Sequence, residues 1–268
     1  MDLQQRAAES ILTFWAEAGV DVCLNETPVD RLAEGAARLK ARQQPAPVTV
    51  ARAAVQAKGP DVSAACAEAA RLAKAAQNLE QLAAAIAGFE GCGLRYEGAR
   101  QAVFYRGDLA ASLMIVGEGP GADEDARGEP FVGKAGQLLD KMLAAAGLTG
   151  RVFITNTVFW RPPGNRTPTA AEQLVCAPFV ERAIELVNPR MLMLVGGASA
   201  KHMLRREEGI LSLRGRWFEW KSADETLALP ALPTLHPAFL LRQPAAKKKA
   251  WTDLLTLTER LDRPDRPA

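Results

Sequence analysis

The most restrictive feature of this sequence is an apolar run that ends in a glycine-rich turn. Residues 113–116 are Leu-Met-Ile-Val, and Gly117, Gly119 and Gly121 follow at alternate positions. An unbroken apolar run of this length is typical of a parallel strand that is buried on both faces. Glycines let the chain turn sharply and approach a ligand closely. Because open α/β sheets bind ligands at the carboxyl ends of their strands, the carboxylate in this turn, Glu118, is a candidate functional group.

The turn does not match the glycine-rich loops that bind phosphate. It lacks the Lys-Ser/Thr pair of a P-loop and the glycine spacing of a dinucleotide-binding fingerprint. Asp123, Glu124 and Asp125 follow it directly, and their negative charge would repel a phosphate held nearby. The turn therefore predicts a site for a ligand other than a nucleotide phosphate.

The pattern along the rest of the chain predicts an α/β fold. Strand patterns occupy residues 112–116, 152–155, 191–195 and 233–235, and helical patterns occupy residues 136–146, 170–186 and 198–206. Strands that alternate with helices indicate a parallel sheet with helices on both faces. We expect a three-layer α/β/α architecture around a central parallel four-stranded sheet, preceded by a helical N-terminal extension.

Composition shifts divide the chain into five segments. We expect a helical extension over residues 1–43, a Pro/Ala-rich linker over 44–60, one alanine-rich helix over 61–87, the α/β domain over 88–260 and a tail over 261–268. Proline and alanine-rich sequence with few large apolar residues is typical of linkers. The alanine-rich segment carries Leu72, Leu79 and Leu82 on one helical face.

Charge and composition indicate the cellular compartment more clearly than they indicate the function. The 268-residue chain has a formal charge of +2, so overall charge does not indicate a nucleic-acid partner. Local basic clusters, such as Lys247-Lys248-Lys249, are better candidates for phosphate contacts. The sequence has no apolar run of transmembrane length and no signal peptide, so we expect a cytoplasmic protein with no membrane partner and with reduced cysteines.

Four motifs in a fixed order identify a family resemblance. They are G-E-G-P-G at 117–121, P-F-V-G-x-A-G at 130–136, T-N-x-V-x-x-R-P-P-x-N-R-x-P at 155–168 and H-P-A-x-L-L-R at 236–242. Together they resemble the family 4 uracil-DNA glycosylases over about residues 88–258. The resemblance implies a DNA repair enzyme that flips uracil out of DNA and hydrolyses its N-glycosidic bond, leaving an abasic site. Uracil-containing DNA is the implied partner, and we expect a monomer.

The resemblance also implies roles for individual residues. Phe131 stacks on the flipped uracil, and Gly119 lets the backbone approach the base. The amide of Asn156 offers one donor and one acceptor, complementary to uracil O4 and N3–H. His236 donates a hydrogen bond to O2 while neutral. Glu118 positions water or offsets positive charge on the sugar. No lysine occupies a position expected of a nucleophile, so strand cleavage is not expected.

Residues near the motif ends are expected to contact DNA. Phe239 and Leu240, with Leu241, are candidates for the wedge that fills the space left by the flipped nucleotide. Three motif arginines are candidates for phosphate contacts: Arg161, Arg166 and Arg242.

The cysteine pattern departs from the family. Family 4 enzymes hold a four-iron cluster on four cysteines, whose positions here are occupied by Phe89, Cys92, Trp160 and Cys176. Cys23 and Cys66 do not restore the spacing. Since two thiolates supply half of the required ligands, we expect no iron–sulfur cluster and no other metal. Phe89 and Trp160 are large enough to fill the vacated volume.

Two other functions remain open on the sequence. One is a non-catalytic protein that binds uracil or abasic DNA and lost its activity with the cluster. The other is a glycosylase of the same fold that removes another deaminated base. Retention of Glu118, Phe131, Asn156 and His236 favours catalysis, and a base-release assay distinguishes the three.

Overall fold

The computed structural model of the chain describes residues 62–262. The helical extension predicted over 1–43, the linker over 44–60 and the last residues of the predicted tail lie outside the described residues. Among the described residues, no helix combines the length and apolar character needed to cross a membrane.

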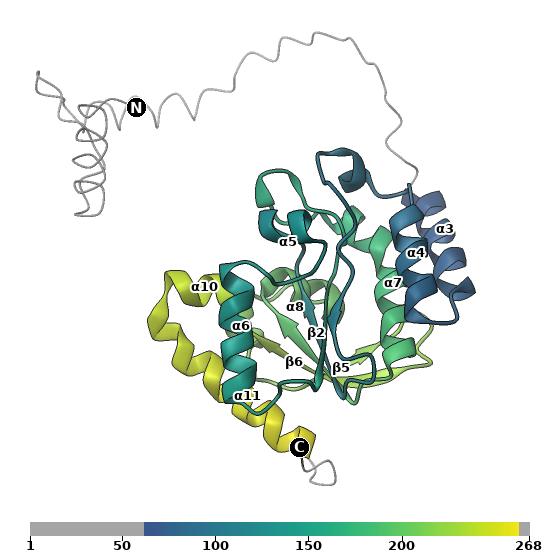
Figure 1. Cartoon of the computed structure of the whole chain (residues 1–268). Helices are drawn as coiled ribbons and strands as arrows, with labels where there is room; N and C mark the ends of the chain where they lie inside the picture. The colour runs from purple at the N-terminus through teal and green to yellow at the C-terminus, as the bar shows by residue number, and fades with distance from the viewer. Residues whose placement is uncertain (1–61, 263–268) are drawn as a thin grey trace, which may run out of the picture. The chain divides into compact units, whose positions relative to one another are not determined.

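A mixed sheet lies at the centre of the described part of the chain (Figure 1). Its strand order is β1-β3-β2-β4-β6-β5, in which β2, β3, β4 and β6 run parallel and the edge strands β1 and β5 run antiparallel to their neighbours. The strands are β1 (Arg106–Gly107), β2 (Leu113–Gly117), β3 (Val152–Asn156), β4 (Met191–Val195), β5 (Phe218–Lys221) and β6 (Ala228–Thr234).

The four parallel strands confirm the predicted fold class, but the sheet is wider than predicted. The prediction omitted β1, which is two residues long, and β5, whose Phe-Glu-Trp-Lys sequence has no apolar run. It also began the last strand at 233, whereas β6 begins at Ala228. Pro230 and Pro233 lie inside β6, and proline lacks the N–H that a strand pattern normally requires.

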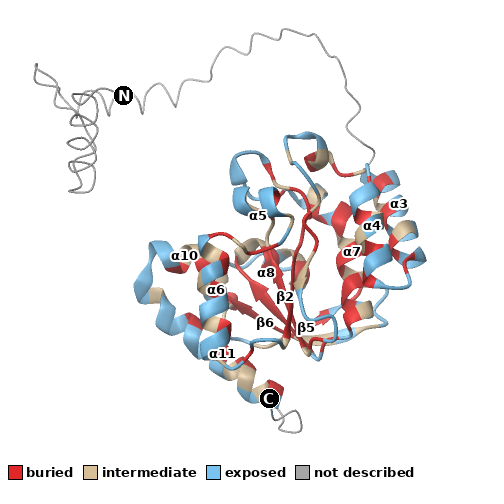
Figure 2. Ribbon diagram, viewed as in Figure 1, coloured by how far each residue is buried: buried red, intermediate tan, exposed pale blue. Residues whose placement is uncertain are grey.

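Helices cover both faces of the sheet, so the architecture has the three predicted layers (Figures 1 and 2). The described helical segments are α3 (Val62–Ala75), α4 (Leu79–Gly88), η1 (Gly93–Tyr96), α5 (Ala122–Arg127), α6 (Lys134–Ala145), η2 (Pro163–Asn165), α7 (Ala170–Val187), α8 (Gly197–Leu204), α9 (Ile210–Leu213), α10 (Pro237–Arg242), η3 (Pro244–Ala246) and α11 (Lys247–Asp262).

Side chains of the central strand alternate between two cores, as a strand period of two requires. In β2, Met114 and Val116 pack in the cluster that contains Phe179 of α7. Leu113 and Ile115 pack in the cluster on the opposite face, with residues of α6 and α11. Figure 2 shows the strands buried between these helices. The apolar run at residues 113–116 is therefore buried on both faces, as predicted.

The alanine-rich segment forms two helices, not the single helix predicted over 61–87. Asn78 lies between α3 and α4, and its side chain accepts a hydrogen bond from the backbone N–H of Gln81 at 2.9 Å. Asparagine favours this capping position over a helix interior, because its side chain satisfies an unpaired backbone donor. Ala69 of α3 and Leu82 of α4 share a core cluster with Phe179 of α7. The boundary predicted at residue 88 therefore does not separate two cores.

Candidate active site

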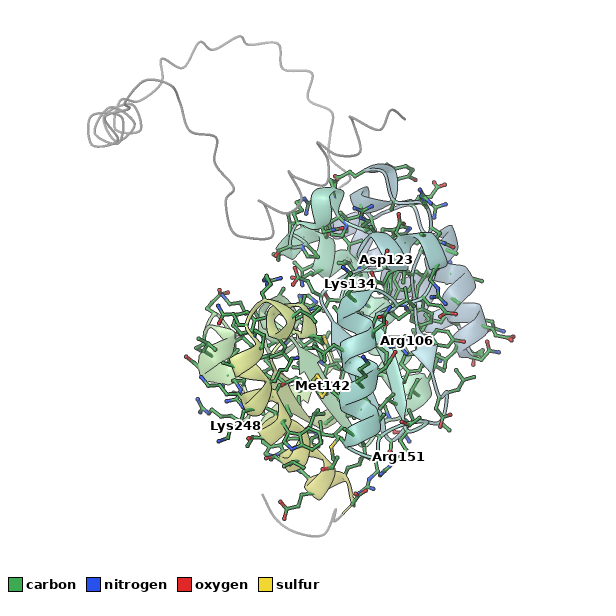
Figure 3. All side chains as sticks on the ribbon, turned by 60° about the vertical axis from the view of Figure 1, so that its left-hand side comes forward. Arg106, Asp123, Lys134, Met142, Arg151 and Lys248 are labelled. Atoms are coloured by element: carbon green, nitrogen blue, oxygen red, sulfur yellow. The ribbon has the colours of Figure 1, made fainter. Side chains whose placement is uncertain are left out.

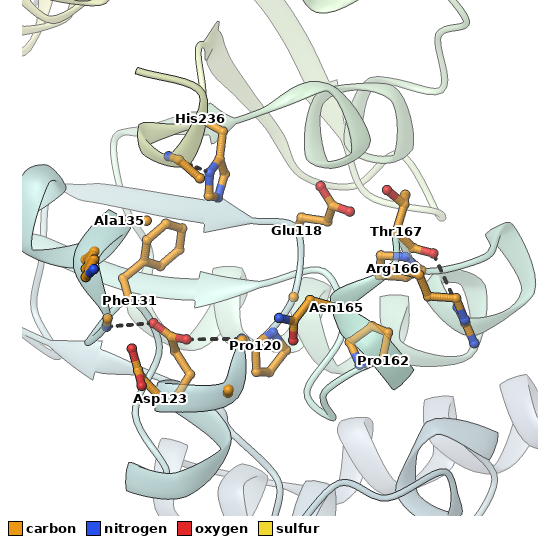
Figure 4. A pocket seen from close by; sticks show the side chains of 18 of the residues that line it. Glu118, Pro120, Asp123, Phe131, Ala135, Pro162, Asn165, Arg166, Thr167 and His236 are labelled. Atoms are coloured by element: carbon orange, nitrogen blue, oxygen red, sulfur yellow. Dashed lines mark hydrogen bonds between the residues drawn. The ribbon is translucent and has the colours of Figure 1, made fainter. Parts of the chain in front are cut away.

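A pocket of about 600 Å³ lies at the carboxyl ends of the parallel strands (Figure 4). Its lining comes from residues 118–124 after β2, 131–135 before and at the start of α6, 162–168 after β3 and 236–242 after β6. The chain leaves β2 for β3 on one side and later returns to β4 on the other, so this edge is the switch point where open α/β sheets bind ligands.

The pocket brings together most of the predicted site residues. Its lining includes seven of them: Glu118, Gly119, Phe131, Arg166, His236, Phe239 and Arg242. Figure 4 shows His236 and Phe131 at one side of the pocket, with Glu118, Thr167 and Arg166 toward the other. Asn156, Arg161 and Leu240 are not among the lining residues.

Buried polar groups fix the turn that carries Glu118. The backbone N–H of Thr157 donates to the carbonyl of Gly117 at 3.0 Å, and the Thr157 hydroxyl donates to the carbonyl of Glu118 at 2.6 Å. The amide of Gln173 in α7 donates to that hydroxyl at 3.1 Å. The Glu118 carboxylate itself has no hydrogen-bond partner among the described residues, so it remains available inside the pocket.

Phe131 has a backbone conformation that residues with side chains rarely adopt. Its φ is 55°, in the left-handed region, and its ring is buried. The ring centroid lies 5.6 Å from that of His236 with an interplanar angle of 31°. A Cβ atom at Gly136 would overlap the Phe131 carbonyl, which explains the glycine at this position of the motif.

Glu124 connects the two loops that frame the pocket. One carboxylate oxygen accepts the backbone N–H groups of Val132 and Gly133, each at 2.9 Å, and the other accepts the N–H of Gly121 at 3.1 Å. Apart from its negative charge, Glu124 was not predicted to act in the site. A signal existed, because a glutamate three residues after a helix N-cap is typical of a capping box, and Gly121 caps α5. Thr157 and Gln173 carried no comparable signal.

Asn156 ends β3 directly beside the end of β2. Its side chain is 1% exposed, and its Oδ1 is the buried side-chain N or O atom without a hydrogen-bond partner among residues 62–262. A Cβ atom at Gly117 would overlap this Oδ1 and lie 2.5 Å from the ring of Phe131. Glycine at 117 therefore lets the amide and the aromatic ring both pack closely against the end of β2. A buried unpaired acceptor costs about 1–3 kcal/mol, which points to a ligand that would satisfy it.

His236 caps α10 in a neutral form. Its Nδ1 accepts the backbone N–H of Ala238 at 3.2 Å, so the proton of the neutral ring lies on Nε2. Burial, together with the positive charge of Arg242, lowers the pKa of His236 to about 4, whereas Glu124 acts in the opposite direction. At neutral pH the ring is a neutral donor at the pocket wall.

The three arginines predicted to contact phosphate differ in their surroundings. Arg166 is ion-paired with Glu172 at 2.7 Å and Glu97 at 3.2 Å, and the hydrogen bond to Glu172 raises its pKa. Arg161 donates to the side-chain oxygen of Asn165 at 2.7 Å. Arg242 is exposed at the pocket and has no ion pair among the described residues. Arg242 is thus the arginine most open to a new anionic partner.

The predicted wedge needs one correction. Leu240 is 0% exposed and packs with Leu235 and Ala250, so it does not reach the surface that DNA would contact. The next residue, Leu241, is 44% exposed, and Phe239 is half-buried at the pocket. The exposed face of a short helix cannot be assigned from three consecutive apolar residues, which is why the sequence pattern did not separate Leu240 from Leu241.

The four positions that correspond to cluster ligands form a packed apolar region. The ring centroid of Phe89 lies 6.5 Å from that of Trp160 and 5.2 Å from that of Phe179. Cys92 and Cys176 are buried, and the interaction between their thiols lowers the pKa of Cys92 and raises that of Cys176. Two thiols and two aromatic rings do not match the four thiolates of a four-iron cluster. Residues 62–262 contain no group of three or more side chains suited to a metal ion.

Titration of the histidines tests the electrostatics of this site. The pKa of His236 is lowered to about 4, and burial lowers that of His202 in α8 to about 4 as well. We predict that neither ring charges between pH 5 and pH 8, which can be measured from imidazole NMR shifts, with His202→Gln to assign the two signals. A midpoint for His236 at or above its usual value would contradict the neutral donor. Because the neutral form is favoured in the fold, the stability from these groups is lost as pH falls from about 6.5 toward 4.

Comparison with known proteins assigns this arrangement to a family. The family model described as Uracil DNA glycosylase superfamily matches residues 104–255, which include β2 to β6 and the whole pocket. Three similar proteins carry the name type-4 uracil-DNA glycosylase.

These relatives are matched over most of their own length. The protein from Pyrobaculum aerophilum is 41% identical over 160 residues, which are 58% of this chain and 81% of that protein. The one from Thermotoga maritima is 38% identical over 138 residues, 51% of this chain and 69% of that protein. The one from Saccharolobus solfataricus is 36% identical over 168 residues, 60% of this chain and 77% of that protein. The resemblance found in the motifs is confirmed, and the chain belongs to the uracil-DNA glycosylase superfamily.

Proposed function

We propose that this protein is a monofunctional uracil-DNA glycosylase of DNA repair. It flips uracil out of DNA and hydrolyses its N-glycosidic bond, leaving an abasic site in an unbroken strand. The observation that carries the proposal is the unpaired, buried Oδ1 of Asn156 beside the ring of Phe131. The names of the type-4 relatives support the same activity.

Base recognition follows from the donor and acceptor pattern of Asn156. The free Oδ1 accepts the N3–H of uracil, and the amide NH₂ donates to O4. Cytosine has an acceptor at N3 and a donor at its exocyclic amine, so each contact would leave a polar group unpaired. The cost is about 1–3 kcal/mol for each unpaired group. Phe131 stacks on the flat face of the base, and the left-handed backbone at 131 sets the direction of its ring.

His236 and Glu118 stabilise opposite charges that develop during the reaction. As the bond between C1′ and N1 breaks, the electron pair moves to uracil and the sugar becomes oxocarbenium-like. The neutral His236 donates from Nε2 to O2, where negative charge develops. The Glu118 carboxylate offsets the positive sugar or orients the water whose oxygen adds to C1′, while the water proton passes to solvent or to the departing uracil.

The DNA contacts lie at the rim of the pocket. Arg242 contacts a phosphate, since its guanidinium is exposed and has no carboxylate partner among the described residues. Leu241 and Phe239 are the wedge candidates. We further propose that the protein acts as a cytoplasmic monomer on uracil-containing DNA.

The direct test is release of uracil from a DNA oligonucleotide. We predict that the wild-type protein releases free uracil and that strands break only after alkali. Asn156→Asp should abolish most of this activity, because the carboxylate lacks the donor for O4. Binding without release would support the alternative of a non-catalytic DNA-binding protein. Release of another deaminated base, but not of uracil, would support a glycosylase of the same fold with a different substrate. Unchanged uracil kinetics in Asn156→Asp would contradict the recognition role.

A second prediction concerns His236. Replacing it with alanine should lower the rate of base release by about 10²–10³-fold, the usual effect of removing one such donor. Binding of uracil-containing DNA should change much less, because the hydrogen bond strengthens only as the uracil anion forms. Single-turnover rates and equilibrium binding should be measured together. His202→Gln is the matched control, since His202 lies in α8 outside the pocket, and a near-normal rate in His236→Ala would remove this residue from the mechanism.

We propose that the protein holds no iron–sulfur cluster and that aromatic packing replaces it. Trp160 is buried and packs against Phe89 and Phe159 just before the loop that lines the pocket. We predict that Trp160→Ala lowers the free energy of unfolding by roughly 3–5 kcal/mol, measured by denaturant titration. Trp251→Ala, at the partly exposed position on α11, is the control and should have a much smaller effect. Visible absorption typical of an iron–sulfur centre, or stoichiometric iron in the purified protein, would contradict the proposal.

A further inference from the structure

We infer that Arg106, a residue outside every motif, is a positioning residue for base recognition. Its guanidinium holds the backbone at residues 130 and 131 so that the ring of Phe131 faces the pocket. The inference rests on the proposed function only where base release is the readout. Arg106 itself is not among the lining residues, so it acts through Phe131.

The contacts of Arg106 converge on one short loop. Its Nε donates to the carbonyl of Pro130 at 2.7 Å, and its Nη2 donates to the carbonyl of Phe131 at 3.1 Å. The same Nη2 is bonded to Asp140 of α6 at 2.6 Å. Arg106 lies in edge strand β1, paired with Ile154 of β3, so its backbone is anchored in the sheet. One side chain thus connects the sheet, the loop and α6.

The loop needs such a connection because its conformation is unfavourable by itself. Phe131 has a φ of 55°, a conformation that persists for a bulky residue only where its surroundings hold it. A planar guanidinium can donate to two neighbouring carbonyls at once, whereas a lysine ammonium provides a single charged centre on a flexible stem. Arg106 is therefore suited to fix the orientation of two successive peptide groups.

The opposite side of the loop is held by Glu124. Arg106 supplies donors to the carbonyls of residues 130 and 131, while Glu124 accepts the N–H groups of Val132 and Gly133. The loop is consequently fixed from both sides by charged side chains. Loss of Arg106 removes one side of this restraint and lets the ring of Phe131 leave its stacking position.

Mutations separate this role from general stabilisation. We expect Arg106→Ala to lower kcat/KM for uracil release by about 10–100-fold, the scale of a misplacement near 1 Å in a binding site. Arg106→Lys should keep the fold yet lose part of the same activity. Lysine keeps the positive charge but lacks the planar guanidinium that donates to two carbonyls at once. The matched control is Arg151→Ala, which removes an exposed ion pair of 2.7 Å with Asp262. Figure 3 shows Arg151 at the far end of α6 from Lys134, well away from Arg106. This control should retain activity within about twofold.

A double-mutant cycle with Phe131→Ala gives the sharpest result. If Arg106 acts through the ring, Arg106→Ala should add little loss in the Phe131→Ala background. A purely structural role would instead lower activity by the same factor in both backgrounds. Equal losses, or an Arg106→Ala variant with activity within about twofold of wild type, would overturn the inference.

Amide hydrogen exchange tests the loop without any need for activity. We expect faster exchange at residues 131–136 in Arg106→Ala and Arg106→Lys, and no change there in Arg151→Ala. Unchanged exchange in both Arg106 variants would overturn the inference even if the protein releases no base. A wild-type protein that leaves uracil-containing DNA intact would instead contradict the proposed function, while the exchange result would still decide the role of Arg106.

Discussion

The missing side chain at Gly117 is the constraint on which the pocket depends. Gly117 ends the central strand and pairs in register with Asn156 at the end of its neighbour. Any Cβ atom at 117 would overlap the Asn156 amide oxygen and press on the ring of Phe131. The amide, the ring and the Glu118 turn can share one edge of the sheet only because this position is empty. The sheet register therefore determines which groups meet at the base of the pocket.

Around that edge, backbone groups are held by buried or partly buried polar side chains. Thr157 fixes the carbonyl of Glu118, and Glu124 gathers three backbone N–H groups from two loops. His236 is held in one neutral tautomer by the N–H of Ala238. Such preorganised groups can stabilise developing charge without rearranging during the reaction. Burial also keeps His236 neutral, so its donor strength does not change near neutral pH.

The sequence predicted the parts of the fold that depend on strong local patterns. The apolar runs of β2, β3 and β4 and the helical period of α7 located the parallel core, because burial on both faces favours apolar residues over most of each strand. The edge strands could not be predicted in this way, since β1 is two residues long and pairs only with β3. The break between α3 and α4 depends on the capping hydrogen bond of Asn78, and the continuous alanine-rich sequence on both sides gave no sign of it.

The sequence predicted the site residues that belong to recognisable motifs. It could not predict the orientation and pairing of side chains that depend on contacts between distant parts of the chain. The sequence could not indicate that Leu240 turns inward or that Arg166 is paired with Glu97, which is distant in the chain. It also gave no reason to consider Arg106, whose bonds to residues 130 and 131 exist only after β1 joins the sheet. Roles that depend on one side chain reaching another loop require the folded chain.

A crystal structure of the protein with free uracil bound would test the central claim most directly. We predict uracil stacked on Phe131, with its N3–H donating to the Asn156 Oδ1 that is otherwise unpaired and its O2 facing Nε2 of His236. Uracil bound elsewhere, or an Asn156 amide oxygen satisfied by another protein group while the base makes no contact with it, would contradict the account.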